Sequence, residues 1–213
     1  MMKAAAVKET MALRNGVEMP LVGLGVMNMY GSECVRAICE AVEAGYRMID
    51  TAAIYGNEGA VGRGIRESGA EREELFITTK LWVQDQGYEA AKKAVTASLE
   101  RLGLDYLDLY LIHQPFGDVY GSWRAMEELY KAGTLRAIGV CNFTDTQLAD
   151  LAEFNEIAPM VNQIELHPYF PQFEREDVHK QYGVQLEAWG PLAEAKNGIF
   201  ENEILVSIAG KYG

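Results

Sequence analysis

The stretch YRMIDTAAIYGNEGAVGRGIRES, residues 46–68, joins three different patterns. Its first five residues are mostly apolar and end on Asp50, as in a buried strand that gives way to a loop. The loop carries Tyr55, and a helix-like run follows it. The next apolar run, LFITTK at 75–80, again ends on a polar residue, Lys80. A strand, a helix and a second strand in this order predict two parallel strands joined by a right-handed crossover.

The same unit recurs along the rest of the chain. Near-continuous apolar runs, typical of parallel strands that are covered on both faces, alternate with amphipathic helical runs. The predicted strands are 46–50, 75–80, 107–113, 135–142, 160–167 and 184–190. Asn15-Gly16 lies between two short apolar runs and predicts an N-terminal β-hairpin over 10–25. We therefore expect one α/β domain over 1–213 with six strand–helix units.

Polar or aromatic side chains mark the C-terminal ends of these strands. They are Asp50, Lys80, His113, Asn142, His167 and Trp189. In a closed (β/α) barrel these ends converge on one mouth, where barrel enzymes build their sites. In an open sheet, strands lie about 4.8 Å apart and residues on distant strands could not meet. The pattern favours a barrel.

The number of units is smaller than a closed barrel needs. A TIM barrel has eight units, so six leave a gap and two unpaired apolar edges, at 46–50 and 184–190. We expect that the sequence lacks part of a longer C-terminal region; the alternative is that a partner chain fills the gap. If the chain is complete as given, self-association through the open edges is expected.

Composition excludes several classes of protein. The net charge of −12 disfavours nucleic acid or an anionic membrane as a partner. The three cysteines, Cys34, Cys39 and Cys141, have neither metal-site spacing nor a disulfide framework. No signal peptide and no run long enough to span a membrane is recognised. These features predict a cytoplasmic location.

Six motifs, in the same order and spacing as in one family, carry a resemblance. They are DTAAIYGNE, LFITTKLW, LDLYLIHQP, GVCNF, VNQIELHP and EAWGPL. Together they resemble the aldo-keto reductases, over residues 10–213. The resemblance implies a (β/α)8 TIM barrel whose bottom is closed by the N-terminal hairpin. It also implies an oxidoreductase that reduces aldehydes or ketones with NADPH.

The family's catalytic tetrad maps onto Asp50, Tyr55, Lys80 and His113. Carbonyl reduction needs a hydride from a cofactor and a proton from a side chain whose pKa is brought toward the working pH. Tyr55 would donate the proton, and Lys80 is expected to lower the pKa of its phenol. Asp50 would pair with Lys80. His113 would hydrogen-bond the substrate oxygen.

The resemblance also implies cofactor and substrate contacts. The cofactor residues are Cys141, Asn142, Gln163, Trp189, Gly190 and Leu192. The first three would hold the nicotinamide carboxamide, Trp189 would stack on its ring, and the last two would lie along the pyrophosphate. NADPH is expected, with NADH as the alternative because the family's basic residues for the 2′-phosphate have no counterpart here. The apolar substrate contacts would be Met27, Trp82 and Phe116, which suit small to medium carbonyl compounds.

Three other interpretations compete with this one. Gly23-x-Gly25 lacks the third glycine and the helix of a dinucleotide fingerprint, so we interpret it as the first loop of the barrel mouth. A metal-dependent hydrolase is disfavoured, because His113 and His167 have no carboxylate cluster beside them and Lys80 would repel a cation. The serious alternative is a catalytically weak scaffold, derived from a reductase, that acts as a binding or regulatory protein.

Overall fold

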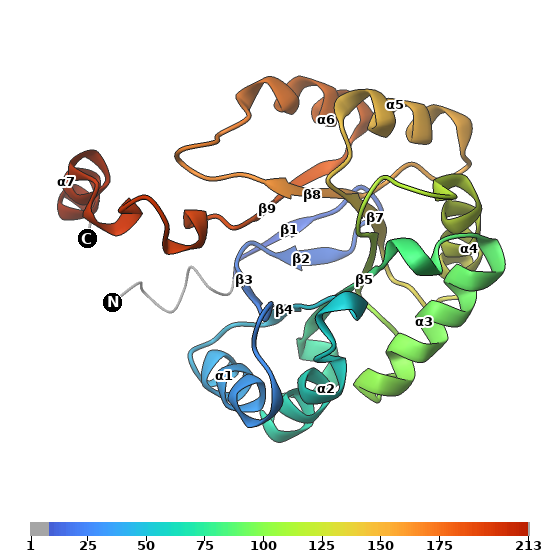
Figure 1. The fold of residues 1–213 in the computed structure, drawn as a ribbon, viewed down its shortest axis with the longest axis horizontal. Helices are drawn as coiled ribbons and strands as arrows, with labels where there is room; N and C mark the ends of the chain where they lie inside the picture. Colours follow the sequence, from blue (N-terminus) through green and yellow to red (C-terminus); the bar gives the residue numbers. More distant parts are fainter. Residues whose placement is uncertain (1–8, 213) are drawn as a thin grey trace.

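The computed structural model describes residues 9–212, and its main feature is a parallel sheet curled into an open, barrel-like layer (Figure 1). Seven strands form this sheet in sequence order, each parallel to its neighbours. They are β3 (Gly23–Gly25), β4 (Met48–Asp50), β5 (Phe76–Leu81), β6 (Leu109–Ile112), β7 (Ile138–Cys141), β8 (Val161–Glu165) and β9 (Gln185–Trp189). The architecture confirms the predicted aldo-keto reductase type of α/β fold.

Helices cover the outer face of the sheet (Figure 1). They are α1 (Gly31–Glu43), α2 (Glu58–Glu67), α3 (Tyr88–Leu102), α4 (Val119–Lys131), α5 (Asp145–Phe154) and α6 (Glu176–Tyr182), and a further helix, α7 (Glu203–Tyr212), follows them in the chain. Short 3-10 turns lie at η2 (Ala53–Tyr55), η3 (Arg72–Glu74), η4 (Val83–Asp85), η5 (Phe173–Arg175), η6 (Ala193–Ala195) and η7 (Ile199–Glu201). The α7 helix stands away from the sheet, and its Ile204, Val206 and Ile208 are exposed.

Local sequence signals define the helix ends. Thr144 caps α5 through a reciprocal capping box with Gln147. The side chain of Asp118 accepts a hydrogen bond from the Gly121 N–H at the start of α4. Gly103 ends α3 in the left-handed conformation that glycine adopts without strain. These caps fix the residues at which α4 and α5 begin and the residue at which α3 ends.

The segment 23–25 corrects one sequence prediction. We expected it to be a mouth loop and part of the hairpin, but it forms β3, the first strand of the main sheet, with Gly23 opposite Met48 and Gly25 opposite Asp50. The strand escaped detection because Gly-Leu-Gly contains no apolar run. Glycine is needed here, since a Cβ on Gly23 would lie 2.8 Å from the Met48 side chain. The described sheet therefore has seven strands rather than six, and β4 is not an edge.

The N-terminal hairpin is confirmed, but it is shorter than expected. β1 (Thr10–Ala12) pairs antiparallel with β2 (Glu18–Pro20), and Gly16 in the turn has φ +83°. The side chain of Asn15 donates to the Arg136 carbonyl at 2.9 Å, and Arg14 donates to the Tyr182 carbonyl at 3.1 Å. Both acceptors lie just before strands of the main sheet. The hairpin thus contacts the sheet at the N-terminal ends of its strands.

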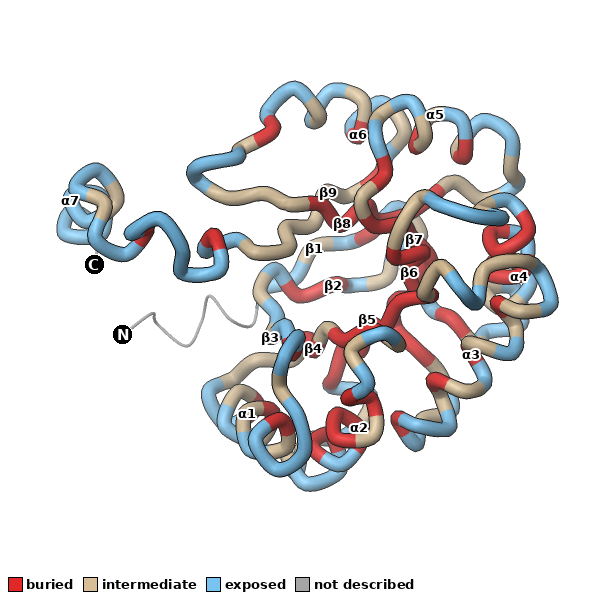
Figure 2. Tube along the Cα trace, in the orientation of Figure 1, coloured by how far each residue is buried: buried red, intermediate tan, exposed pale blue. Residues whose placement is uncertain are grey.

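The most deeply buried strands are β5, β6 and β7, which run through the middle of the sheet (Figure 2). Among the largest fully buried side chains, one is charged: Lys80, only 1% exposed. A buried ammonium is strongly unfavourable unless it is paired and hydrogen-bonded. Lys80 must therefore have a charged partner and hydrogen-bond acceptors close to it.

Candidate active site

Lys80 lies at the C-terminal end of β5 and is held by β4. Its Nζ forms an ion pair with Asp50 Oδ1 and donates to the Thr51 carbonyl at 3.0 Å. The same Nζ lies 5.5 Å from the centroid of the Tyr55 ring. Burial alone would lower the pKa of Lys80, but Asp50, with Tyr55 and Cys141, more than reverses this effect and the pKa is raised. Lys80 is therefore an ammonium at neutral pH.

Tyr55 is placed by the loop that follows β4. The loop is anchored by Asn57, whose Oδ1 accepts from Thr51 Oγ1 at 2.6 Å. Asn57 Nδ2 donates to the carbonyls of Val26 and Met29 at 2.8 and 3.0 Å. Since Asn57 is buried, the first bond fixes the Tyr55 loop internally and the other two tie it firmly to the loop after β3.

The acidity of Tyr55 differs from the sequence expectation. Burial raises the pKa of its phenol, and this effect outweighs the opposing influence of Lys80; Asp50 and Cys141 raise it further. Lys80 lowers the pKa of the phenol as expected, but the expectation of a net lowered pKa was wrong because burial, which is not visible in a sequence, has the larger effect. Tyr55 is therefore a neutral phenol at neutral pH.

His113, at the end of β6, completes the predicted tetrad. Its ring lies edge-on to Tyr55, with centroids 5.8 Å apart, and edge-on to Trp82 at 5.2 Å. Burial, together with Lys80, lowers the pKa of His113 to about 4, so the imidazole is neutral. Its Nδ1 is buried without a hydrogen-bond partner among the described residues. The structure thus brings Asp50, Tyr55, Lys80 and His113 together.

Gln163, on β8, connects this cluster to the predicted cofactor residues. Its Nε2 donates to Asp50 Oδ2 at 2.9 Å, and its Oε1 accepts from Cys141 Sγ at 3.8 Å. Cys141 is 1% exposed, and burial raises the pKa of its thiol to about 12. The thiol is therefore neutral and acts only as a weak hydrogen-bonding group.

Asn142 occupies a strained turn directly after β7. It has φ +63°, a left-handed conformation that asparagine tolerates better than most residues. Its Nδ2 donates to the His113 carbonyl at 3.1 Å, and its Oδ1 accepts from Trp189 Nε1 at 2.9 Å. Asn142 therefore joins the ends of β6, β7 and β9, and the half-buried Trp189 is fixed in orientation.

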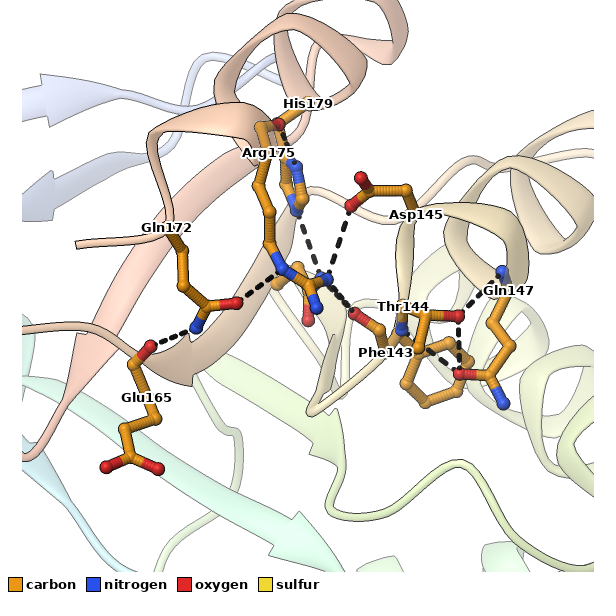
Figure 3. A network of polar contacts seen from close by, with 9 residues as sticks. Phe143, Thr144, Asp145, Gln147, Glu165, Gln172, Arg175 and His179 are labelled. Carbon is orange, nitrogen blue, oxygen red and sulfur yellow. Dashed lines mark hydrogen bonds and ion pairs between the residues drawn. The ribbon is translucent and has the colours of Figure 1, made fainter. Parts of the chain in front are cut away.

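A polar network holds the loops after β7 and β8 (Figure 3). Arg175 Nη1 donates to the Phe143 carbonyl at 3.1 Å and to Asp145 Oδ1 at 3.2 Å. Arg175 Nε donates to Gln172 Oε1 at 2.6 Å, and Gln172 in turn donates to the Glu165 carbonyl. Because Phe143 follows Asn142, this network also restrains the backbone of Asn142.

The remaining predicted contacts are distributed unevenly. Trp82 is half-buried against His113, whereas Met27 and Phe116 are 48% and 63% exposed in their loops. Gly190 adopts φ +60° beside Trp189, and both line a cavity of about 270 Å³. Leu192 is 59% exposed. Trp82 therefore lies against the tetrad, while Met27, Phe116 and Leu192 lie on the surface around it.

Sequence reasoning missed two side chains of this site. Asn57 was quoted within a motif but given no role. Glu187 lies on β9 directly opposite Gln163 on β8, with its Oε2 buried. The signal for Glu187 was present: it stands two residues before Trp189, so both side chains project from the same face of the strand.

Within residues 9–212, no group of three or more histidine, cysteine, aspartate or glutamate side chains is placed to hold a metal ion. In the same part of the chain, no helix combines the length and apolar character needed to cross a bilayer.

A profile described as "Aldo/keto reductase family" matches residues 22–204. The chain belongs to the aldo/keto reductase family. This aldo/keto reductase is 54% identical over 209 residues to the glyoxal reductase of Bacillus subtilis (strain 168). The match covers 97% of this chain and 75% of that enzyme.

Solved structures agree with this assignment. An aldo/keto reductase from Brucella melitensis superposes with a TM-score of 0.91 at 44% identity, over 96% of this reductase and 79% of that chain. A Bombyx mori aldo-keto reductase in complex with NADP superposes with a TM-score of 0.88 at 35% identity, over 96% and 76% of the two chains. The family and these relatives identify this protein as an oxidoreductase.

Proposed function

We propose that this aldo/keto reductase reduces aldehydes or ketones to alcohols, with NADPH as hydride source and Tyr55 as proton donor. The observation that carries the proposal is the placement of the Lys80 ammonium, 1% exposed and paired with Asp50, beside the Tyr55 ring. Burying an ion pair costs desolvation free energy, so such pairs are often functional. Beside a phenol, the ammonium of this pair can stabilise the phenolate that proton donation leaves.

The residues present fit a nicotinamide cofactor. Gln163 and Asn142 present carboxamide groups that can bond a carboxamide, and Trp189 is held by Asn142 with its ring half-exposed. When bound, NADPH supplies the hydride that the carbonyl carbon accepts. The B. mori relative is described in complex with NADP, which supports the choice of cofactor.

The chain's own side chains manage the proton. As the carbonyl carbon gains a hydride, its oxygen takes the Tyr55 proton, and the phenolate that remains is stabilised by Lys80. Asp50 keeps Lys80 charged and in place. The neutral His113 can donate a hydrogen bond to the same oxygen through one ring nitrogen. The alcohol leaves, and Tyr55 recovers its proton from water.

The relative's name suggests a first substrate. Because the B. subtilis relative is named glyoxal reductase, glyoxal is the small dicarbonyl compound to test first, beside 4-nitrobenzaldehyde as a generic aldehyde. The half-buried Trp82 against His113 fits a small, partly apolar compound. NADH is tested in parallel. A cytoplasmic location stays a prediction.

The test follows the absorbance of the reduced cofactor with the purified chain. We expect turnover that falls at least about 100-fold in Tyr55→Phe. Tyr110→Phe is the matched control, because it also removes one tyrosine hydroxyl. That hydroxyl is buried on β6, next to β5, and has no hydrogen-bond partner among the described residues. Equal turnover in Tyr55→Phe and wild type would overturn the role of Tyr55. Cofactor binding without any turnover would favour the scaffold alternative.

A further inference from the structure

Glu187 is a half-buried residue whose carboxyl oxygen Oε2 is buried, and the proposed reaction does not use it. It lies on β9 in register with Gln163, which in turn is in register with Cys141 on β7. The three side chains therefore form a row on the inner face of the sheet. Glu187 Oε2 is buried and has no hydrogen-bond partner among the described residues. A buried carboxyl oxygen without a partner needs a physical explanation.

The opposite face of the same strands accounts for the other nearby charges. Asn162 and Leu186, each one residue earlier, are paired in register and project outward. Asn162 Nδ2 lies 3.0 Å from His179 Nε2 of α6. The titratable groups of α6 are Glu176, Asp177, His179, Lys180 and Tyr182. They belong to the outer layer, so the groups that face Glu187 are Asp50, Lys80 and Cys141, with the Gln163 amide.

These neighbours disfavour a second negative charge. Burial raises the pKa of Glu187 to about 8, and repulsion by Asp50 adds to this effect. Lys80 and the Gln163 amide oppose the shift but do not cancel it. Among residues 9–212, Lys80 has one ion-pair partner, Asp50, so an ionised Glu187 would leave an uncompensated charge in the interior.

We propose that Glu187 is a further positioning residue of this reductase: its protonated carboxyl orients the Gln163 amide and keeps the cluster of Glu187, Asp50 and Lys80 at zero net charge. The inference rests on the proposed function for its catalytic consequence, but not for the protonation itself. With Glu187 neutral, the Lys80 ammonium stabilises the Tyr55 phenolate against one carboxylate. With Glu187 ionised it faces two, and the phenolate becomes harder to form.

The protonation is tested on the chain without cofactor. Infrared spectra at about pH 6.5, where ordinary carboxyl groups are ionised, should contain the C=O band of a protonated carboxylic acid. That band should titrate away with a midpoint near pH 8 and be absent in Glu187→Gln. Glu165→Gln is the matched control, because Glu165 lies on the adjacent strand with its side chain 42% exposed. An unchanged spectrum in Glu187→Gln, or a wild type without the band, would overturn the proposal.

The catalytic consequence has its own readout. The kcat of the wild type should fall about tenfold between pH 7 and pH 9, because ionisation of Glu187 raises the pKa of Tyr55 and makes its proton harder to transfer. Glu187→Gln should lose less than about twofold over the same range, since glutamine keeps the shape and cannot ionise. Identical pH profiles would overturn the charge role. If Tyr55→Phe proves fully active, the proposed function fails, while the infrared titration still decides whether Glu187 holds its proton.

Discussion

Gln163 Nε2 donates a hydrogen bond to Asp50 Oδ2 at 2.9 Å, although the two residues lie 113 positions apart and on strands β8 and β4. Three strands separate β4 from β8 in the sheet, and the contact is made across its concave face. Asp50 thereby pairs with Lys80 through Oδ1 and accepts a hydrogen bond from Gln163, a predicted cofactor residue, through Oδ2. One carboxylate connects the proton donor to the residues expected to hold the nicotinamide.

Removing Lys80 should harm stability and activity together. We expect Lys80→Met to destabilise the chain by about 3–5 kcal/mol, because the Asp50 carboxylate then lacks its ion-pair partner. The double variant Asp50→Asn/Lys80→Met should regain much of that stability without regaining turnover. Urea unfolding and steady-state rates measure the two effects. Full activity in the double variant would contradict the role of the ammonium.

His113 should make stability depend on pH. Its pKa is lowered in the folded chain to about 4, so the unfolded chain takes up the proton first as the pH falls. Stability should therefore be complete above about pH 6.5 and decline by about 2–3 kcal/mol toward pH 4. Denaturation in His113→Gln should lack this part of the decline. The same slope in variant and wild type would show that His113 is not held neutral.

Asn57 should control the rate through the position of Tyr55. We expect Asn57→Ala to lower kcat about tenfold or more, because the three bonds that anchor the Tyr55 loop are lost and misplacement of a catalytic group is costly. The control is Asn202→Ala, because Asn202 is half-buried and its Oδ1 accepts hydrogen bonds from Ile204 and Leu205 at the start of α7, away from the Tyr55 loop. Unchanged kcat in Asn57→Ala, with folding verified by circular dichroism, would mean that the loop is fixed by other contacts.

Two glycines of α2 should respond in opposite ways to the same change. A Cβ at Gly62 would lie 2.0 Å from the Leu102 carbonyl oxygen of α3, whereas a Cβ at Gly59 would meet its nearest atom at 3.9 Å. Gly62→Ala should therefore destabilise the chain by about 2 kcal/mol or more through overpacking. Gly59→Ala should be neutral or stabilise by up to about 1 kcal/mol through helix propensity. Thermal unfolding of both variants tests the α2–α3 contact.

The strands that sequence predicted well are those whose apolar residues run without interruption. The run at 75–80 lies almost entirely in β5, because a strand covered on both faces needs apolar side chains on both. β3 was missed because its close packing against Met48 requires glycine, and glycine carries no hydrophobic signal. The placement of Asp50, Lys80 and His113 followed from strand ends, and the expected roles of the site residues came from the family resemblance. The pKa shift of Tyr55 and the proposed role of Glu187 depend on burial, which only the folded chain defines.

We propose above all that Tyr55 supplies the proton in carbonyl reduction. The most direct measurement is the single-turnover rate of NADPH oxidation by glyoxal or 4-nitrobenzaldehyde, in wild type and Tyr55→Phe, with cofactor binding measured in parallel. We expect comparable cofactor binding and a rate at least about 100-fold lower in the variant. A variant that oxidises NADPH within about twofold of the wild-type rate would contradict it.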